Sequence, residues 1–249
     1  MRLSAVTLLK SGVFAIRTRI LEAAGVAAAL AATLLLHPAR AAEAEADAEQ
    51  ALLPALATSD AVARVTQWVA AEGDNGSLPY IVIDKQTAAM LLFDGSGKLL
   101  GETPVLIGIG VGDESSPGIG GKTLGEIGPA ERTTPAGRFV ARLGTAVGWK
   151  SVLWVDYADS VALHAVVKDI KKDKRPERLK SPTADDNRIT FGCINIDTAF
   201  YLKQVKPAFK KGGLVYILPD TKPLEEVFPR VRLLPYLEAE AQTVAAIES

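Results

Sequence analysis

Short apolar segments, each bounded by turn residues, follow one another through the middle of the chain. The first two are residues 80–84 and 89–93, and the Asp-Gly-Ser-Gly run at 94–97 is typical of a hairpin turn. Similar segments predict further strands at residues 104–109, 137–143, 152–155, 160–165 and 214–218. Because few residues separate these segments, they favour an all-β sandwich or barrel over alternating βα units.

Apolar residues at helical spacing precede these strands. Three valines predict a short helix over residues 61–71, and Asp60 stands where its N-cap residue is expected. Upstream, residues 42–59 are rich in alanine and acidic side chains and allow either a helix or a loose spacer. We therefore treat residues 42–77 as a helical or spacer segment ahead of the β-rich region.

Two more helical segments are predicted in the second half of the chain. Residues 197–209 read as one helix between the last two strands. Residues 220–249 read as a helical tail that covers the domain, with breaks near Pro229 and Pro235. The fold class we expect is mainly β with α, a sandwich or barrel flanked by helices.

The N-terminal pattern is that of a secretory signal peptide. Four basic residues precede an apolar run at residues 23–36, and Ala39-Arg40-Ala41 follows as a small-residue cleavage site. A membrane-spanning helix needs about 20 apolar residues, so cleavage is favoured over a permanent anchor. We expect residues 1–41 to direct export to the periplasm and to be the chain's only link to the membrane.

Charge argues against a nucleic-acid partner. The whole chain has 28 Lys and Arg against 29 Asp and Glu. Removing residues 1–41 takes away five basic residues and one acidic residue, which leaves 23 against 28 and a net charge of −5. Binding to phosphates calls for a basic balance or patch.

The chain has a single cysteine, Cys193, so no intrachain disulfide can form. A lone thiol outside the cytoplasm is exposed to oxidation, which suggests that it has a use. The helix predicted from residue 197 would place the thiol at a helix entrance, where backbone N–H groups stabilise a thiolate. Gly192 allows the backbone to approach a substrate closely and to direct N–H groups at an oxyanion. The alternative is a buried structural cysteine.

A nucleophilic thiol needs a base, and the chain has two histidines, His37 and His164. His37 is lost with the signal peptide. His164 lies at the end of the strand predicted at residues 160–165, where a side chain can reach the rim of a sheet. One histidine and one cysteine cannot supply a usual metal-ligand set, so we expect no metal and no cofactor.

Three motifs occur in the order of a known family. His164 ends a strand, Thr-Pro-Ala-Gly-Arg-Phe stands at residues 134–139, and Thr-Phe-Gly-Cys-Ile-Asn stands at residues 190–195. On these motifs the chain resembles the L,D-transpeptidase catalytic domain of the YkuD type over residues 78–219. The resemblance implies that Cys193 is the nucleophile and that His164 is the base.

The chain also departs from the family pattern. Ala165 stands where glycine usually follows the histidine, Thr190 where serine is frequent, and Asn195 where arginine is frequent. Both polar variants keep hydrogen-bonding capacity. The resemblance implies that the carbonyl of Ala165 orients the imidazole, while the Gly192 and Cys193 N–H groups bind the oxyanion.

The resemblance implies acyl transfer on peptidoglycan stem peptides through a thioester. The acceptor would be a second stem's amine, a free D-amino acid, a lipoprotein lysine or water. Two alternatives stay open: a hydrolase on the same fold, which cleaves crosslinks or lipoprotein attachments, and a non-catalytic cell-wall-binding module. The loop at residues 168–188 lies between base and nucleophile and carries eight basic and five acidic residues. It reads as a solvated face or as a substrate lid.

Overall fold

The computed structural model describes residues 58–248 except 147 and 169. The predicted signal peptide at 1–41 and most of the spacer before the first helix lie outside the described residues. Within the described part of the chain, no helix is long and apolar enough to cross a membrane.

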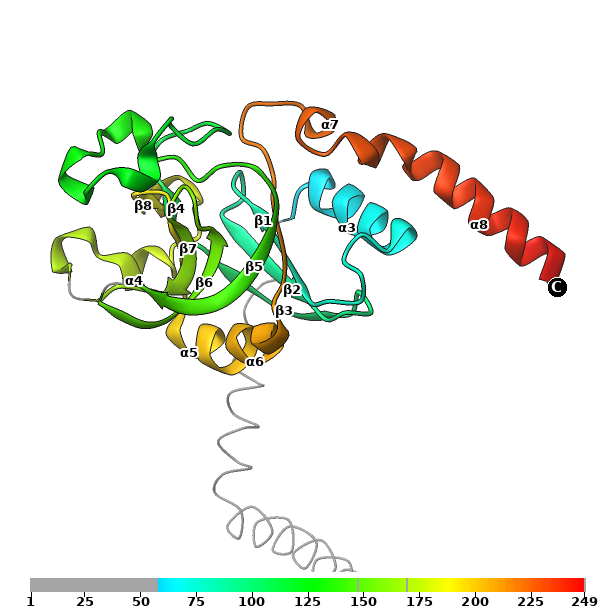
Figure 1. Cartoon of the computed structure of the whole chain (residues 1–249), viewed down its shortest axis with the longest axis horizontal. Coiled ribbons are helices and arrows are strands. Elements are labelled where there is room, and N and C mark those ends of the chain that lie inside the picture. The colour runs from blue at the N-terminus through cyan, green and yellow to red at the C-terminus, as the bar shows by residue number, and fades with distance from the viewer. Residues whose placement is uncertain (1–57, 147, 169, 249) are drawn as a thin grey trace, which may run out of the picture. The chain divides into compact units, whose positions relative to one another are not determined.

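An eight-stranded mixed sheet forms the centre of the domain, in the order β3-β2-β1-β10-β5-β6-β7-β9 (Figure 1). Its strands are β1 (Tyr80–Asp84), β2 (Ala89–Phe93), β3 (Leu99–Pro104), β5 (Gly137–Ala146), β6 (Trp149–Asp156), β7 (Val161–Ala165), β9 (Ile194–Ile196) and β10 (Gly213–Ile217). Two short strands, β4 (Ile107–Gly108) and β8 (Arg188–Thr190), pair separately in parallel.

The two ends of the sheet approach each other. Leu106, which follows β3, forms a bridge to Asn195 in β9, with backbone hydrogen bonds of 2.8 and 2.9 Å. The sheet therefore curls into a nearly closed barrel. This closure brings the segment after β3 against the strand that follows Cys193.

Side chains of the central strands alternate between two cores. Ile81 and Ile83 point into one core, while Tyr80 and Val82 of the same strand point into the other. This alternation is the period of two expected of a strand buried on both faces. Both cores are therefore needed to bury β1, and helices cover each of them.

The first core is covered by a helical stretch from Thr198 to Lys211, made of α5 (Thr198–Phe200), a π-helical turn (Tyr201–Val205), α6 (Lys206–Ala208) and a 3₁₀ turn (Phe209–Lys211). Asp197 caps it, because its Oδ1 accepts from the N–H groups of Ala199 and Phe200 at 2.7 and 3.0 Å. Pro207 has no N–H to donate to the preceding turn, and the π-helical turn lies directly before it.

The second core is covered by α3 (Asp60–Glu72) and by the C-terminal segment, on the opposite side of the sheet from α5 and α6 (Figure 1). That segment comprises α7 (Leu224–Val227), a 3₁₀ turn (Pro229–Leu233) and α8 (Leu234–Glu248). Leu224, Phe228 and Val231 are buried against α3. The start of this segment packs on the second core as far as Leu237, and Pro235 lies in the first turn of α8 without breaking it.

The predicted fold class, mainly β with flanking helices, is confirmed by this architecture. The strand predicted at 104–109 was wrong in extent: β3 ends at Pro104, and only Ile107–Gly108 forms a strand. Residue 105 instead receives a hydrogen bond from the Asn187 side chain, whose Nδ2 lies 2.9 Å from the Val105 carbonyl. β3, β8 and β9 were not predicted.

Candidate active site

Cys193 lies in a tight turn between β8 and β9, and Thr190 holds both ends of that turn. The Thr190 hydroxyl donates to the Cys193 carbonyl at 2.6 Å and accepts from the Gly192 N–H at 3.2 Å. The predicted support role of Thr190 therefore has a geometric basis. The Gly192 N–H is engaged inside the turn, so the oxyanion role predicted for it does not fit this geometry.

Gly192 has a backbone conformation that only glycine adopts easily. Its φ is +120°, and a Cβ built on it would lie 2.8 Å from the Thr133 carbonyl oxygen. Thr134 fixes the turn from the same side, because its buried hydroxyl donates to the Gly192 carbonyl at 2.8 Å. The same hydroxyl accepts from the Gly108 N–H at 2.9 Å. The Thr-Pro-x-Gly-x-Phe motif thus supplies the residue that ties Cys193's turn to β4.

The thiol of Cys193 is half-buried and donates to the Ser160 carbonyl at 3.6 Å. Burial raises the pKa of this thiol, while a backbone contact at Ala162 and the charge of Arg175 act in the opposite direction. The resting side chain is therefore a neutral thiol at pH 7.

The expected helix entrance at Cys193 was wrong. Strand β9 separates the thiol from the helical stretch that starts at Thr198, because Ile194–Ile196 pair with Leu163–Ala165 of β7. The N–H groups of that helix are capped by Asp197. The nearby positive charge comes instead from Arg175.

His164 lies near the end of strand β7, and the next residue, Ala165, holds its imidazole. Its Nδ1 lies 2.8 Å from the carbonyl oxygen of Ala165, as the resemblance implied for the residue after the histidine. The residue is 7% exposed. Burial lowers the pKa of His164, the Ala165 contact raises it, and the charge of Arg175 lowers it. The imidazole is neutral at pH 7.

The sheet brings the strand of His164 beside the segment that follows Cys193. β7 and β9 pair in parallel with His164 opposite Asn195, and Cys193 lies in the turn two residues before Asn195. The Cys193 thiol reaches the carbonyl of Ser160, directly before β7, at 3.6 Å. Both side chains are therefore positioned along β7.

Asn195 and Arg175 complete the surroundings of the imidazole. Asn195 is fully buried, and its Nδ2 lies 3.3 Å from Nε2 of His164. Arg175 belongs to α4 (Arg175–Arg178), inside the charged loop, and its guanidinium donates to Oδ1 of Asn195 at 2.9 Å. Asp173 forms an ion pair with the same guanidinium at 2.9 Å. Sequence reasoning counted Arg175 only as one of eight basic residues in the loop.

The basic residues of the loop at 168–188 are of two kinds, exposed lysines and arginines that bind other parts of the domain. Its lysines are exposed, as a solvated face requires: Lys168, Lys171, Lys172, Lys174 and Lys180. Its arginines are built into the domain, since Arg175 is buried and Arg178 donates to the Asp173 and Asp186 carbonyls. Leu179 adds an apolar anchor beside Leu106. The loop is thus partly solvated and partly a wall of the site.

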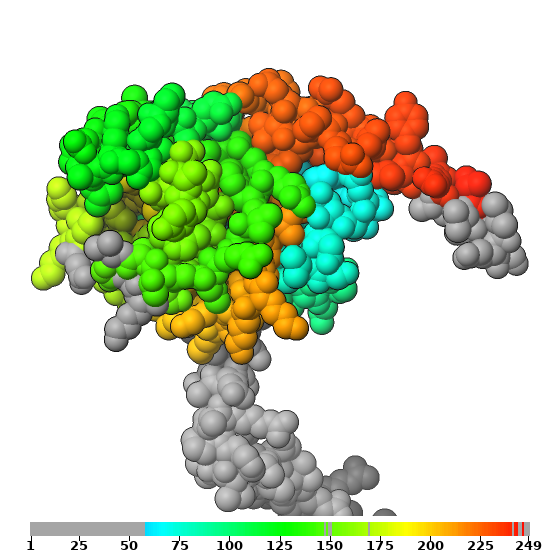
Figure 2. All heavy atoms as spheres, viewed as in Figure 1, coloured from blue at the N-terminus to red at the C-terminus, as the bar shows by residue number. Residues whose placement is uncertain are grey.

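A buried ionic network contacts the site through Thr134, whose hydroxyl holds the Cys193 turn. Nζ of Lys85 is fully buried and lies 3.0 Å from Asp113, 3.4 Å from Asp220 and 2.9 Å from the Thr134 carbonyl. Burial would raise the pKa of Asp113, but N–H groups at Asp220, Lys222 and Thr221, together with Lys85, hold it well below its usual range. Figure 2 shows the loop that contains Asp113 (green) beside the start of the C-terminal segment (orange).

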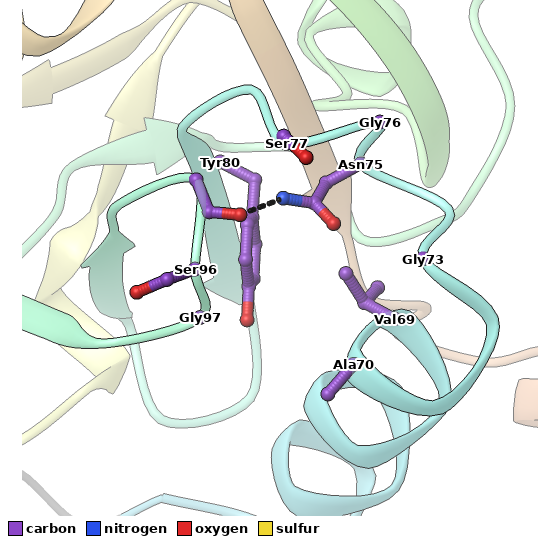
Figure 3. A pocket seen from close by; sticks show the side chains of 10 residues that line it. Val69, Ala70, Gly73, Asn75, Gly76, Ser77, Tyr80, Ser96 and Gly97 are labelled. Carbon is purple, nitrogen blue, oxygen red and sulfur yellow. Dashed lines mark hydrogen bonds between the residues drawn. The ribbon is translucent and has the colours of Figure 1, made fainter.

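A separate cavity of about 220 Å³ lies between the end of α3 and the β2–β3 hairpin (Figure 3). Asn75 points across it and donates from Nδ2 to the Gly95 carbonyl at 3.0 Å. Burial and the charge of Asp94 raise the pKa of Tyr80 in its wall to about 12. The cavity contains none of the predicted site residues. Across the described residues, no group of three or more His, Cys, Asp or Glu lies close enough to hold a metal ion.

Comparison with known proteins found similarity to solved structures. No protein-family model and no curated protein matches the chain. Among solved structures, the chain is similar to the crystal structure of an L,D-transpeptidase from Xylanimonas cellulosilytica, with 17% sequence identity and a TM-score of 0.33. The match covers 57% of this chain and 60% of that chain.

Proposed function

We propose that the chain is a cysteine acyltransferase of the L,D-transpeptidase type. The observation that carries this proposal is the pairing of β7 with β9 beside the turn of Cys193: the Ala165 carbonyl orients His164 in β7, and Cys193 occupies a turn that requires glycine and reaches the Ser160 carbonyl directly before β7. A buried structural cysteine has no need of such a turn.

The chemistry starts from a neutral pair. The thiol leaves the Ser160 carbonyl and gives its proton to Nε2 of His164, and the sulfur attacks an amide carbonyl of the donor. The amide C–N bond breaks, the leaving amine takes the proton from His164, and a thioester remains on Cys193. An acceptor amine then attacks the thioester carbonyl and loses its proton to His164. The C–S bond breaks, the new amide leaves, and the Cys193 thiolate takes the proton back from His164.

Charge on the carbonyl oxygen needs a hydrogen-bond donor during both attacks. Because the Gly192 N–H donates to Thr190, we assign this role to the Cys193 N–H. Thr190 and Thr134 hold the turn from which that group projects. Glycine at position 192 keeps the turn close to the Thr133 carbonyl.

The substrates follow from the sequence resemblance. The donor would be a peptidoglycan tetrapeptide stem that loses its terminal D-Ala. The acceptor would be the amine of a second stem, a D-amino acid or a lipoprotein lysine. The N-terminal pattern supports an enzyme that acts in the periplasm after removal of residues 1–41.

Intact-protein mass spectrometry after incubation with a carbapenem tests the nucleophile. The family resemblance implies that this β-lactam class acylates such cysteines, because the ring opens on the thiolate and the whole inhibitor mass is retained. We expect one adduct per chain, absent in Cys193→Ala and formed more slowly in His164→Ala. A folded, reduced protein that forms no adduct would refute the proposal and favour the binding module.

A second assay separates transfer from hydrolysis. A tetrapeptide donor is incubated with the protein, with and without a D-amino acid as acceptor. Exchange of the terminal residue identifies a transferase, whereas release of D-Ala with no exchanged product identifies the hydrolase. Cys193→Ala serves as the blank in both conditions.

A further inference from the structure

The backbone of Asn195 is fixed from two sides. It pairs with His164 in the β7–β9 ladder, and its N–H and carbonyl both bond to Leu106 on the other side. The side chain therefore projects from a rigid position toward the imidazole. Only the orientation of its amide, oxygen or nitrogen toward the ring, is left to be decided by its neighbours.

Arg175 decides that orientation. A guanidinium can only donate hydrogen bonds, so the Asn195 atom 2.9 Å from it must be the oxygen. The amide nitrogen then faces Nε2 of His164 at 3.3 Å, and since an amide nitrogen can only donate, Nε2 must be unprotonated. The remaining proton lies on Nδ1, where the Ala165 carbonyl accepts it at 2.8 Å.

We propose that Arg175 is a positioning residue that acts through Asn195 to hold His164 in the Nδ1–H tautomer, with Nε2 ready to accept a proton. Asp173 orients the guanidinium by an ion pair at 2.9 Å and is part of the same relay. The charged loop would thus contribute to catalysis through one buried arginine. The catalytic part of this inference rests on the proposed function, whereas the tautomer does not.

The relay also sets the response to pH. Among the charged groups, Arg175 acts on the ring, and Asp173 is its ion-pair partner. An imidazolium would place an N–H against the Asn195 amide and a positive charge near Arg175. Removal of Arg175 should therefore raise the pKa of His164, and the acid limb of the acylation rate should move to higher pH.

The contact at 3.3 Å is slightly longer than the usual range of about 2.7–3.2 Å for N–H donors. The Asn195 amide can thus give way when the Cys193 proton arrives at Nε2. The relay selects the correct tautomer at rest without blocking the transfer.

Nitrogen-detected NMR of the imidazole reads the tautomer directly. The full chain carries His37→Gln so that every imidazole signal comes from His164. We expect the neutral Nδ1–H pattern in this background and a mixture of tautomers in Arg175→Met. In Asn195→Asp a carboxylate faces Nε2, so the ring should become protonated at Nε2 and titrate at a higher pH.

The same variants are measured for carbapenem acylation of Cys193. Loss of part of the general-base contribution, which is about 10²- to 10⁴-fold in enzymes, should slow Arg175→Met by about 10- to 100-fold. Arg175→Lys, which keeps a donor, should recover part of the rate. Arg178→Met is the matched control, because Arg178 lies on the same helix and binds loop carbonyls without touching Asn195.

Three results would overturn the inference: an Nε2–H tautomer in the parent protein, an unchanged ring pattern in Arg175→Met, or the same change in Arg178→Met. Failure of the proposed function would look different. In that case Cys193 would form no adduct in any variant, while the NMR patterns would still follow Arg175 and Asn195.

Discussion

Replacing Thr134 with valine removes one hydroxyl from the support of the Cys193 turn and keeps the size of the side chain. That hydroxyl joins the Gly108 N–H to the Gly192 carbonyl, with both hydrogen bonds buried. Valine leaves a donor and an acceptor without partners. Each buried unsatisfied group costs about 1–3 kcal/mol, so the free energy of unfolding should fall by about 2–6 kcal/mol.

Urea unfolding followed by tryptophan fluorescence measures this loss. With a denaturant slope of about 2 kcal/mol per molar, the midpoint should fall by about 1–3 M. Thr134→Ser keeps the hydroxyl and should stay close to the parent protein. In the folded fraction of Thr134→Val, carbapenem acylation of Cys193 should slow as well, because the carbonyl that fixes Gly192 is released.

Two outcomes would refute this reasoning. One is a Thr134→Val protein whose free energy of unfolding lies within 0.5 kcal/mol of the parent, about the size of an ordinary surface substitution. The other is a serine variant that loses as much as the valine variant, which would show that the methyl group and not the hydroxyl is needed.

Three further predictions concern the same framework. Lys85→Met leaves Asp113 buried without its cation, while Asp220 keeps its ion pair with Arg188, so unfolding in urea should show a loss of about 3–5 kcal/mol; a loss below 1 kcal/mol would contradict the network. Gly192→Ala places a Cβ against the Thr133 carbonyl, and the strain of about 1–3 kcal/mol should appear as a lower thermal midpoint and slower acylation. Gly118→Ala is the control for backbone strain alone, because φ is positive there but the space is open. The lowered pKa of Asp113 contributes stability that is complete above about pH 4, the pKa in the unfolded chain, and is lost as pH falls through the pKa in the folded protein. Asp113→Asn should therefore flatten the decline in unfolding free energy between about pH 4 and 2. An unchanged slope would show that other groups cause the decline.

Much of the fold follows from local patterns. The paired segments at 80–84 and 89–93 are continuous apolar runs separated by turn residues, and both are strands with those bounds. The helix after Cys193 was predicted in the right place, and its cap is Asp197. By contrast, β8 and β9 are three residues long. Periodicity cannot identify such short strands, which exist because closure of the barrel supplies their partners.

The candidate site shows the same division. Sequence motifs name Cys193, His164 and Thr190 as candidates, because the motifs contain the residue types that the resemblance assigns to the site. Arg175 stands among lysines and carries no motif, and only the folded loop shows that it is buried while its neighbours are exposed. The sequence therefore predicted that a helix N-terminus supplies the positive charge near the thiol. In the structure, strand β9 occupies that position, and the charge comes from Arg175.

The position of β10 has a consequence for how the protein reaches its active form. This last strand lies between β1 and β5, near the middle of the sheet. Until residues 213–217 are available, β1 and β5 cannot be joined, and the two halves of the sheet carry open edges. Contacts between segments so distant in sequence form slowly. A chain cut or stalled before Gly213 would thus contain Cys193, His164, Asn195 and Arg175 of the candidate site and still lack the strand that joins the two halves of the sheet.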